Sequence, residues 1–312
     1  MNIIDKNFYQ LVDNIKKQTL EEIYQIIKNN YQKLNPNIQI SLENFLNKFL
    51  YWGTLKKDEE NYEELYNRAQ SLKEHIDDYI WLYNKLNDYR SRKLLFAILN
   101  NWYNFDFETL KTSNETNYPH YFDLDIIKCN QEEIIVDLGS YTGDTITDYL
   151  KYYGTNNYKK IYCYEITDHI FNILKNNLSY YKNIEFRKKA VLDKTQKVYI
   201  SKNKLDNSAN KISTGGDTPI DAVSLDEDIK EKISLIKMDI EGSETKALTG
   251  CKNHIINEQP KLLISVYHNH EDLWKIPKMI DNLYDNYNFY LRYYGNNIFP
   301  TEIVLIATNK KD

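Results

Sequence analysis

A loop with two glycines and a preceding acid is the first part of this sequence whose pattern suits chemistry. Residues 137–144 read Asp-Leu-Gly-Ser-Tyr-Thr-Gly-Asp and follow residues 133–136, whose apolar, β-branched composition is typical of a buried strand. Gly139 and Gly143 permit a tight turn that brings the backbone close to a ligand. The helix that we expect after the turn would favour an anionic group at its first amides, and Asp137 could accept a hydrogen bond from a cationic amine.

A carboxylate and an ammonium group together form the headgroup of an amino acid, and S-adenosylmethionine carries such a headgroup. The glycines follow the spacing Gly-x-x-x-Gly and not the Gly-x-Gly-x-x-Gly that holds the pyrophosphate of a dinucleotide, so the loop favours S-adenosylmethionine over NAD. Glu165 ends the next predicted strand and could accept hydrogen bonds from both ribose hydroxyls. Ala190, which follows a third strand, is placed near the adenine by its position alone.

Two later loops carry groups that could act on a methyl acceptor. Residues 237–244 read Lys-Met-Asp-Ile-Glu-Gly-Ser-Glu, so Asp239 and Glu241 follow a strand and could orient or deprotonate a hydroxyl, whereas Glu244 could cap the next helix. His268 lies just past another strand and is a candidate general base, because imidazole titrates near neutral pH. A hydrogen-bonded structural histidine is the alternative. The two acids and the histidine could also be metal ligands, but we predict no metal.

The strands before these loops alternate with helical segments. This alternation predicts a mostly parallel sheet with helices on both faces, and ligands bind such a sheet at the carboxyl ends of its strands. The last two strands have no helix between them, so we expect them to pair antiparallel at one edge. The expected strands are 133–136, 161–164, 183–186, 197–200, 234–238, 261–266, 289–293 and 302–307, and the expected helices are 145–153, 169–178, 244–248 and 272–287.

The first third of the chain has a helical period and no visible chemistry. Apolar residues recur at helical spacing over 42–50, between Ser41 and Gly53, and further helices are expected from Asp58 to Ile76 and over 91–102. We interpret the aromatic residues of these stripes as core. Residues 112–120 have the composition of a loop. We therefore predict a helical N-terminal domain over residues 1–115 and a cofactor-binding domain over residues 116–312.

Composition and charge limit the class of partner. The 312 residues carry a formal net charge of −5, whereas proteins that bind phosphate backbones usually carry a basic excess. Cys129, Cys163 and Cys251 are widely separated and form neither a disulfide framework nor a Cys-x-x-Cys zinc pair. No apolar run approaches the roughly 20 residues of a membrane span, and the first residues do not resemble a signal peptide. We expect a cytoplasmic protein with no membrane span and no nucleic-acid partner.

Several stretches, taken in this order, resemble the FkbM family of methyltransferases. The resemblance covers about residues 117–309 and implies a class I methyltransferase fold, S-adenosylmethionine as the cofactor, and O-methylation of sugars or other secondary metabolites as the usual activity. One departure is Arg292-Tyr293-Tyr294, where relatives often have Arg-His-Tyr. The matching stretches are Tyr121-Phe122-Asp123, residues 136–145, residues 237–244 with Ala247-Leu248, Ser265-Val266-Tyr267-His268 and Glu271-Asp272-Leu273-Trp274.

We therefore expect a class I methyltransferase-like Rossmann sheet, mostly parallel with an antiparallel edge strand, next to an N-terminal helical domain. The predicted catalytic residues are His268, Asp239 and Glu241, with His268 or Asp239 as the base. The predicted cofactor site comprises Tyr121, Asp137, Gly139, Ser140, Tyr141, Gly143, Asp144, Thr145, Glu165, Ala190 and Asp239.

The predicted reaction is methylation of a hydroxyl of a sugar or glycan precursor, a small-molecule or glycan acceptor. There are two alternatives. The methyl group could be transferred to an amine nitrogen, or the chain could be a non-catalytic binding protein with a degenerate methyltransferase fold. A methyltransferase of nucleic-acid bases usually carries Asn- or Asp-Pro-Pro-Tyr after the fourth strand. This chain has Asp239-Ile240-Glu241-Gly242 there, which argues against that class.

Overall fold

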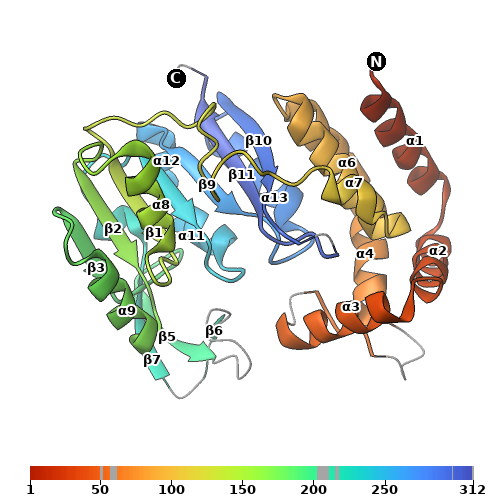
Figure 1. Cartoon of the computed structure of the whole chain (residues 1–312), viewed down its shortest axis with the longest axis horizontal. Helices are drawn as coiled ribbons and strands as arrows, with labels where there is room; N and C mark the ends of the chain where they lie inside the picture. Colours follow the sequence, from red (N-terminus) through yellow and green to blue (C-terminus); the bar gives the residue numbers. More distant parts are fainter. Residues whose placement is uncertain are drawn as a thin grey trace. The chain divides into compact units, whose positions relative to one another are not determined.

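The computed structural model describes residues 1–49, 52–56, 62–201, 211–213, 215, 218–296 and 298–310. The chain divides into two compact units (Figure 1). The first consists of residues 1–116, 266–277 and 289–304, and the second of residues 117–265, 278–288 and 305–312. The expected domain limits of 1–115 and 116–312 stay a prediction. Leu50 and Asp58, which the sequence places in or before helices, lie outside the described residues.

A seven-stranded sheet is the main feature of the fold, as the alternation of strands and helices predicts. Its strand order is β10-β11-β9-β8-β1-β2-β3, and β1 is parallel to β2 and β8, β2 to β3, and β8 to β9. Every residue of β1 is buried, which explains its continuous apolar sequence. The strands are β1 (Ile134–Leu138), β2 (Lys160–Tyr164), β3 (Ile184–Arg187), β8 (Leu235–Met238), β9 (Lys261–Ser265), β10 (Tyr287–Tyr293) and β11 (Ile303–Asn309).

The last two strands pair at one edge of this sheet, as expected from the missing helix between them. The amide of Tyr294 donates to the carbonyl of Glu302 at 3.0 Å, and the amide of Lys310 donates to the carbonyl of Asn286 at 3.1 Å. These two bonds flank β10 and β11 at opposite ends, which is the pattern of an antiparallel pair. The strand β11 lies between β10 and β9, and β10 forms the edge.

Helices follow the parallel strands and lie against the sheet (Figure 1). The predicted helix over 272–287 is too long, because α13 ends at Leu283 and Tyr287 already begins β10. The other predicted limits agree within about two residues, an ordinary uncertainty for helix ends. The helices are α8 (Asp144–Tyr153), α9 (Asp168–Leu178), α10 (Leu225–Asp228), α11 (Glu244–Gly250), α12 (Lys252–Glu258) and α13 (Asp272–Leu283).

The structure contains a second, four-stranded sheet, and the sequence predicts only one of its strands, over residues 197–200. Its order is β4-β7-β5-β6, with β4 (Ala190–Val191) parallel to β7 (Thr218–Val223), and β5 (Gln196–Ser201) antiparallel to β7 and to β6 (Lys211–Ser213). The side chains that hold it together are Ala190, Leu192, Val198, Ile200, Ile220 and Ala222. Two- and three-residue strands carry too little periodic pattern to be recognised in sequence.

The helical part of the first unit is organised around α6, which contacts α1, α2, α4 and α7. Two expected limits are wrong. The helix placed after Ser41 begins at Pro36, because proline fits the first turn, where its missing N–H is not needed, and the stretch up to Ile76 is broken at His75. The helices are α1 (Ile3–Lys17), α2 (Leu20–Gln32), α3 (Pro36–Phe49), α4 (Glu63–Glu74), α5 (Ile76–Lys85), α6 (Tyr89–Asn104) and α7 (Phe107–Lys111).

Within the first unit, the residues before α6 bind the backbone of β10. The amide of Asn87 donates to the carbonyl of Phe289 at 2.9 Å, and the guanidinium of Arg292 lies 2.7 Å from the carboxylate of Asp88. Tyr293 is fully buried, and its hydroxyl donates to the carbonyl of Phe299 at 3.1 Å. Tyr293, where the resemblance implies a histidine in relatives, therefore binds the turn between β10 and β11.

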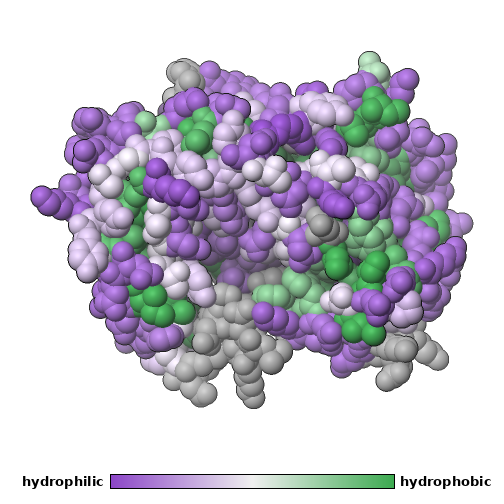
Figure 2. Space-filling view, in the orientation of Figure 1, coloured by the Kyte–Doolittle hydropathy of each residue, from purple (hydrophilic) through white to green (hydrophobic). Residues whose placement is uncertain are grey.

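The surface seen in Figure 2 is mainly hydrophilic, and its hydrophobic residues form small separate patches. The aromatic residues of the N-terminal helices are largely interior; Phe8 and Tyr79, for example, are fully buried. Among the described residues, no helix is both long enough and apolar enough to cross a membrane.

Candidate active site

The glycine loop between β1 and α8 lies where the sequence places it, at the carboxyl end of the central strand. Gly139 (φ +77°) and Gly143 (φ +87°) adopt the left-handed conformation that glycine tolerates. A Cβ on Gly139 would lie 1.8 Å from the carbonyl oxygen of Asp239, so the loop after β1 and the loop after β8 touch through their backbones. The amides of Gly139 and Ser140 both donate to the carbonyl of Tyr164, at 3.1 and 2.9 Å.

Glu165 is fixed beside this loop by backbone amides. One carboxylate oxygen accepts from the amide of Thr167 at 2.7 Å and the other from the amide of Tyr141 at 3.2 Å. Burial raises the pKa of this carboxyl group, while the amide bonds oppose the rise. Tyr141 has a left-handed backbone (φ +45°) and an exposed side chain. The site thus holds a carboxylate of defined orientation at the end of β2.

Asp137 differs from the sequence-based expectation in what it contacts. Its side chain is fully buried, and its carboxylate lies 3.1 Å from the ammonium of Lys237, which is itself 3% exposed. We expected this carboxylate to accept from the amine of a ligand. In the structure it lies next to a lysine of the neighbouring strand, which no sequence motif singles out. The assignment of Asp137 to the cofactor site stays a prediction. The signal that could have revealed Lys237 is a charged residue within an otherwise apolar strand.

Tyr121 reaches the site from the segment before β1. Its hydroxyl donates to the carboxylate of Asp239 at 2.6 Å and lies 3.2 Å from the hydroxyl of Ser265 at the end of β9. The imidazole of His120, which no sequence motif singles out, stacks on the Tyr121 ring with 4.0 Å between the ring centroids. Burial lowers the pKa of His120 to about 4, so this imidazole is neutral at physiological pH. A neutral imidazole thus packs on the ring of Tyr121, and the hydroxyl of that ring binds Asp239.

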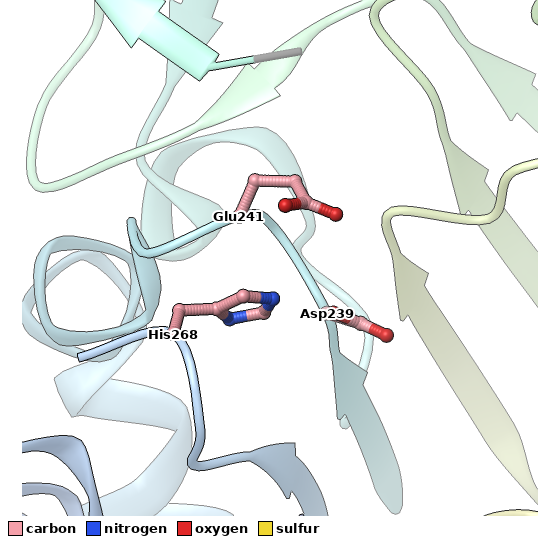
Figure 3. A group of neighbouring side chains, drawn as sticks. All are labelled: Asp239, Glu241 and His268. Atoms are coloured by element: carbon pink, nitrogen blue, oxygen red, sulfur yellow. The ribbon is translucent and has the colours of Figure 1, made fainter. Parts of the chain in front are cut away.

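The acids after β8 separate into different roles. Glu244 is buried, and its carboxylate accepts from the amide of Ile240 at 2.9 Å, so it closes the loop before α11. The predicted cap of this helix by Glu244 stays a prediction. Asp239 and Glu241 project from the same loop, and His268 follows β9 (Figure 3). One ligand-type atom from each of these three side chains lies within 4.8 Å of those of the other two.

The remaining predicted residues lie on the loop and the helix that follow β1, or in the small sheet. Ser140 is buried, and its hydroxyl donates to the carbonyl of Asp137 at 2.9 Å. Asp144 and Thr145 begin α8, with Asp144 exposed and Thr145 buried. Ala190 is buried in the core of the four-stranded sheet. Their assignment to the cofactor site stays a prediction.

A comparison with solved structures finds a protein of similar fold. The chain is similar to a methyltransferase FkbM from Methylobacillus flagellatus KT, at 23% identity and a TM-score of 0.66 over 77% of this chain, and it spans 61% of the length of that protein. Two further structures match less well. An rRNA methylase from Streptococcus thermophilus has 15% identity and a TM-score of 0.38, with 58% of this chain and 89% of the other covered. An Aeropyrum pernix fibrillarin has 12% identity and a TM-score of 0.34, with 57% of this chain and 67% of the other covered.

None of the curated proteins matches the chain significantly. The family described as the methyltransferase FkbM domain matches residues 137–298, which is just over half of the chain. This range begins at Asp137 and includes the glycine loop, Glu165, Asp239 and His268. The chain therefore belongs to the FkbM methyltransferase family, and its cofactor is S-adenosylmethionine.

Proposed function

We propose that this protein transfers a methyl group from S-adenosylmethionine to a hydroxyl of a sugar or glycan precursor, and that it does so in the cytoplasm. The observation that carries the proposal is the environment of Asp239. Its carbonyl oxygen packs on Gly139 of the glycine loop, and its carboxylate is held by the hydroxyl of Tyr121. An oriented carboxylate next to a cofactor loop suits an acceptor that must lose a proton.

The residues around the glycine loop fit the cofactor chemically. The carboxylate of Glu165, fixed by two backbone amides, offers acceptor lone pairs for the two ribose hydroxyls. The first amides of α8 (Asp144–Tyr153) offer donors to the cofactor carboxylate. When bound, S-adenosylmethionine supplies an electrophilic methyl group on a sulfonium.

The residues of the chain would align the acceptor and take its proton. The acceptor hydroxyl would give up its proton to a base of the chain as its oxygen takes the methyl group that S-adenosylmethionine would supply. We propose Asp239 or His268 as this base, with Glu241 as a further group that orients the acceptor. Alignment of two reactants lowers the activation free energy by several kcal/mol. A general base increases the rate by about 10²–10⁴-fold.

The test is methyl transfer from radiolabelled S-adenosylmethionine to a panel of nucleotide sugars, each paired with an analogue in which one hydroxyl is replaced by hydrogen. We expect label in at least one sugar and its loss in the matching deoxy analogue. Asp239→Asn and His268→Gln should lower turnover by about 10²-fold or more for the true base. Label only in amine acceptors would refute O-methylation. Binding of S-adenosylhomocysteine without any turnover on the panel would favour a non-catalytic protein.

A further inference from the structure

Lys237 is a buried lysine at the cofactor edge of the sheet, and the proposed reaction does not use it. It is the third residue of β8, and its Cα partner in the parallel pairing with β1 is Asp137. Paired residues of neighbouring strands project from the same face of a sheet. The sheet register therefore sets the ammonium against the Asp137 carboxylate, 3.1 Å away, with 4% of the lysine side chain and none of the aspartate side chain exposed.

The same ammonium also binds the glycine loop. It donates a hydrogen bond to the carbonyl oxygen of Gly139 at 2.7 Å. Gly139 is also the residue on which an added Cβ would lie 1.8 Å from the carbonyl oxygen of Asp239, in the loop after β8. A hydrogen bond to a charged group is stronger than one between neutral groups. Lys237 thus fixes the carbonyl of Gly139 as well as the side chain of Asp137.

A third contact extends from Lys237 to the acceptor side. The ammonium lies 5.2 Å from the centroid of the Tyr121 ring, within the range of a cation–π interaction. The hydroxyl of that ring donates to Asp239 at 2.6 Å. One buried cation therefore contacts the glycine loop and the ring that orients the proposed base.

The charge on Lys237 is retained despite its burial. Burial acts to lower the pKa of this amine, but the carboxylates of Asp137 and Asp239 outweigh it and hold the pKa above its ordinary value. An isolated buried ammonium or carboxylate would be strongly unfavourable, so each group of the pair requires the other. The Asp137 carboxylate is therefore the counter-ion of Lys237.

We propose that Lys237 is a positioning residue of the cofactor site: its ammonium, held by Asp137, fixes the Gly139 carbonyl and, through Tyr121, the carboxylate of Asp239. This inference rests on the assignment of the glycine loop to the cofactor and does not depend on the identity of the acceptor.

The chain offers a matched control in Lys261, the first residue of β9. Its ammonium lies 2.7 Å from the carboxylate of Glu133, with side-chain exposures of 13% and 2%, at the amino ends of the strands. Lys237→Met and Lys261→Met each leave one buried carboxylate without its lysine. In the full-length protein we expect both to lower the unfolding temperature. Only Lys237→Met should weaken S-adenosylhomocysteine, by at least about tenfold in calorimetry, as for one lost charged hydrogen bond.

The double variant Lys237→Met/Asp137→Asn separates positioning from charge neutralisation. It removes both charges, so it should recover much of the stability that the single variant loses, and it remains informative if that single variant does not fold. We expect S-adenosylhomocysteine to bind it at least about tenfold more weakly than the wild type, because the bond to the Gly139 carbonyl is still missing.

Wild-type affinity in a stable double variant would overturn the proposal and leave Lys237 as a counter-ion only. Equal loss of affinity in Lys261→Met would overturn it as well, because the effect would then follow general stability. If the wild-type chain itself does not bind S-adenosylhomocysteine, the cofactor site assignment fails, and this inference fails with it.

Discussion

Gly139→Ala tests whether the contact between the loops after β1 and β8 shapes the cofactor site. The new methyl carbon would lie 1.8 Å from the carbonyl oxygen of Asp239, and this neighbour is backbone, which cannot rotate away. Alanine at φ +77° also has to adopt a left-handed conformation, which costs about 1–2 kcal/mol. Overpacking adds about 1–3 kcal/mol. We therefore expect a total destabilisation of about 2–5 kcal/mol.

Gly143→Ala is the matched control in the same loop. Its backbone is left-handed as well (φ +87°), but a Cβ there would meet the methyl group of Leu178 at 3.0 Å, the far end of a flexible side chain. Only the conformational cost of about 1–2 kcal/mol is expected. Unfolding temperature and the affinity for S-adenosylhomocysteine would be measured for both variants.

The two glycine variants should differ in both measurements. Each kcal/mol corresponds to a decrease of about 2–4 °C for a chain of this size class, so Gly139→Ala should unfold several degrees below Gly143→Ala. The displaced loops should also reduce its affinity at least about tenfold, or about 1.4 kcal/mol. Equal unfolding temperatures together with wild-type affinity in Gly139→Ala would refute the argument that this contact sets the site.

Three further predictions concern single side chains. Glu165→Ala should weaken both S-adenosylmethionine and S-adenosylhomocysteine by at least about tenfold in calorimetry, since hydrogen bonds to a charged group contribute about 1.5–3 kcal/mol each; unchanged affinity would remove Glu165 from the site. Tyr121→Phe deletes the bond to Asp239 and should lower kcat by about 10- to 100-fold at saturating cofactor, and an unchanged kcat would exclude an orienting role. Burial lowers the pKa of His270 to about 3, so the folded chain loses stability as the pH falls from about 6.5, where the unfolded imidazole binds its proton. Between pH 6.5 and pH 4, the unfolding temperature of His270→Phe should therefore decrease less than that of the wild type. Parallel curves of unfolding temperature against pH would contradict this.

Much of the fold could be predicted because its signals are local. Each apolar run and each helical stripe is a property of neighbouring residues, and the glycine spacing at 139 and 143 reports a backbone conformation that few other residues adopt. The order of strands and helices then limits the topology, since parallel strands require crossover connections. The sheet was predicted correctly on this basis, and the resemblance of several motifs to the FkbM family added the family and supported S-adenosylmethionine.

The sequence by itself therefore determined the kind of sheet and the cofactor, and it predicted a loop to bind that cofactor. Tertiary structure alone decided which side chains meet: Asp137 turns to Lys237 because β1 and β8 are neighbours in register, and Tyr121 reaches Asp239 across 118 positions of the chain. The four-stranded sheet likewise depends on pairing between short segments. The physical reason is that such contacts depend on strand order and register, which join residues that are distant in the sequence and leave no periodic signal in it.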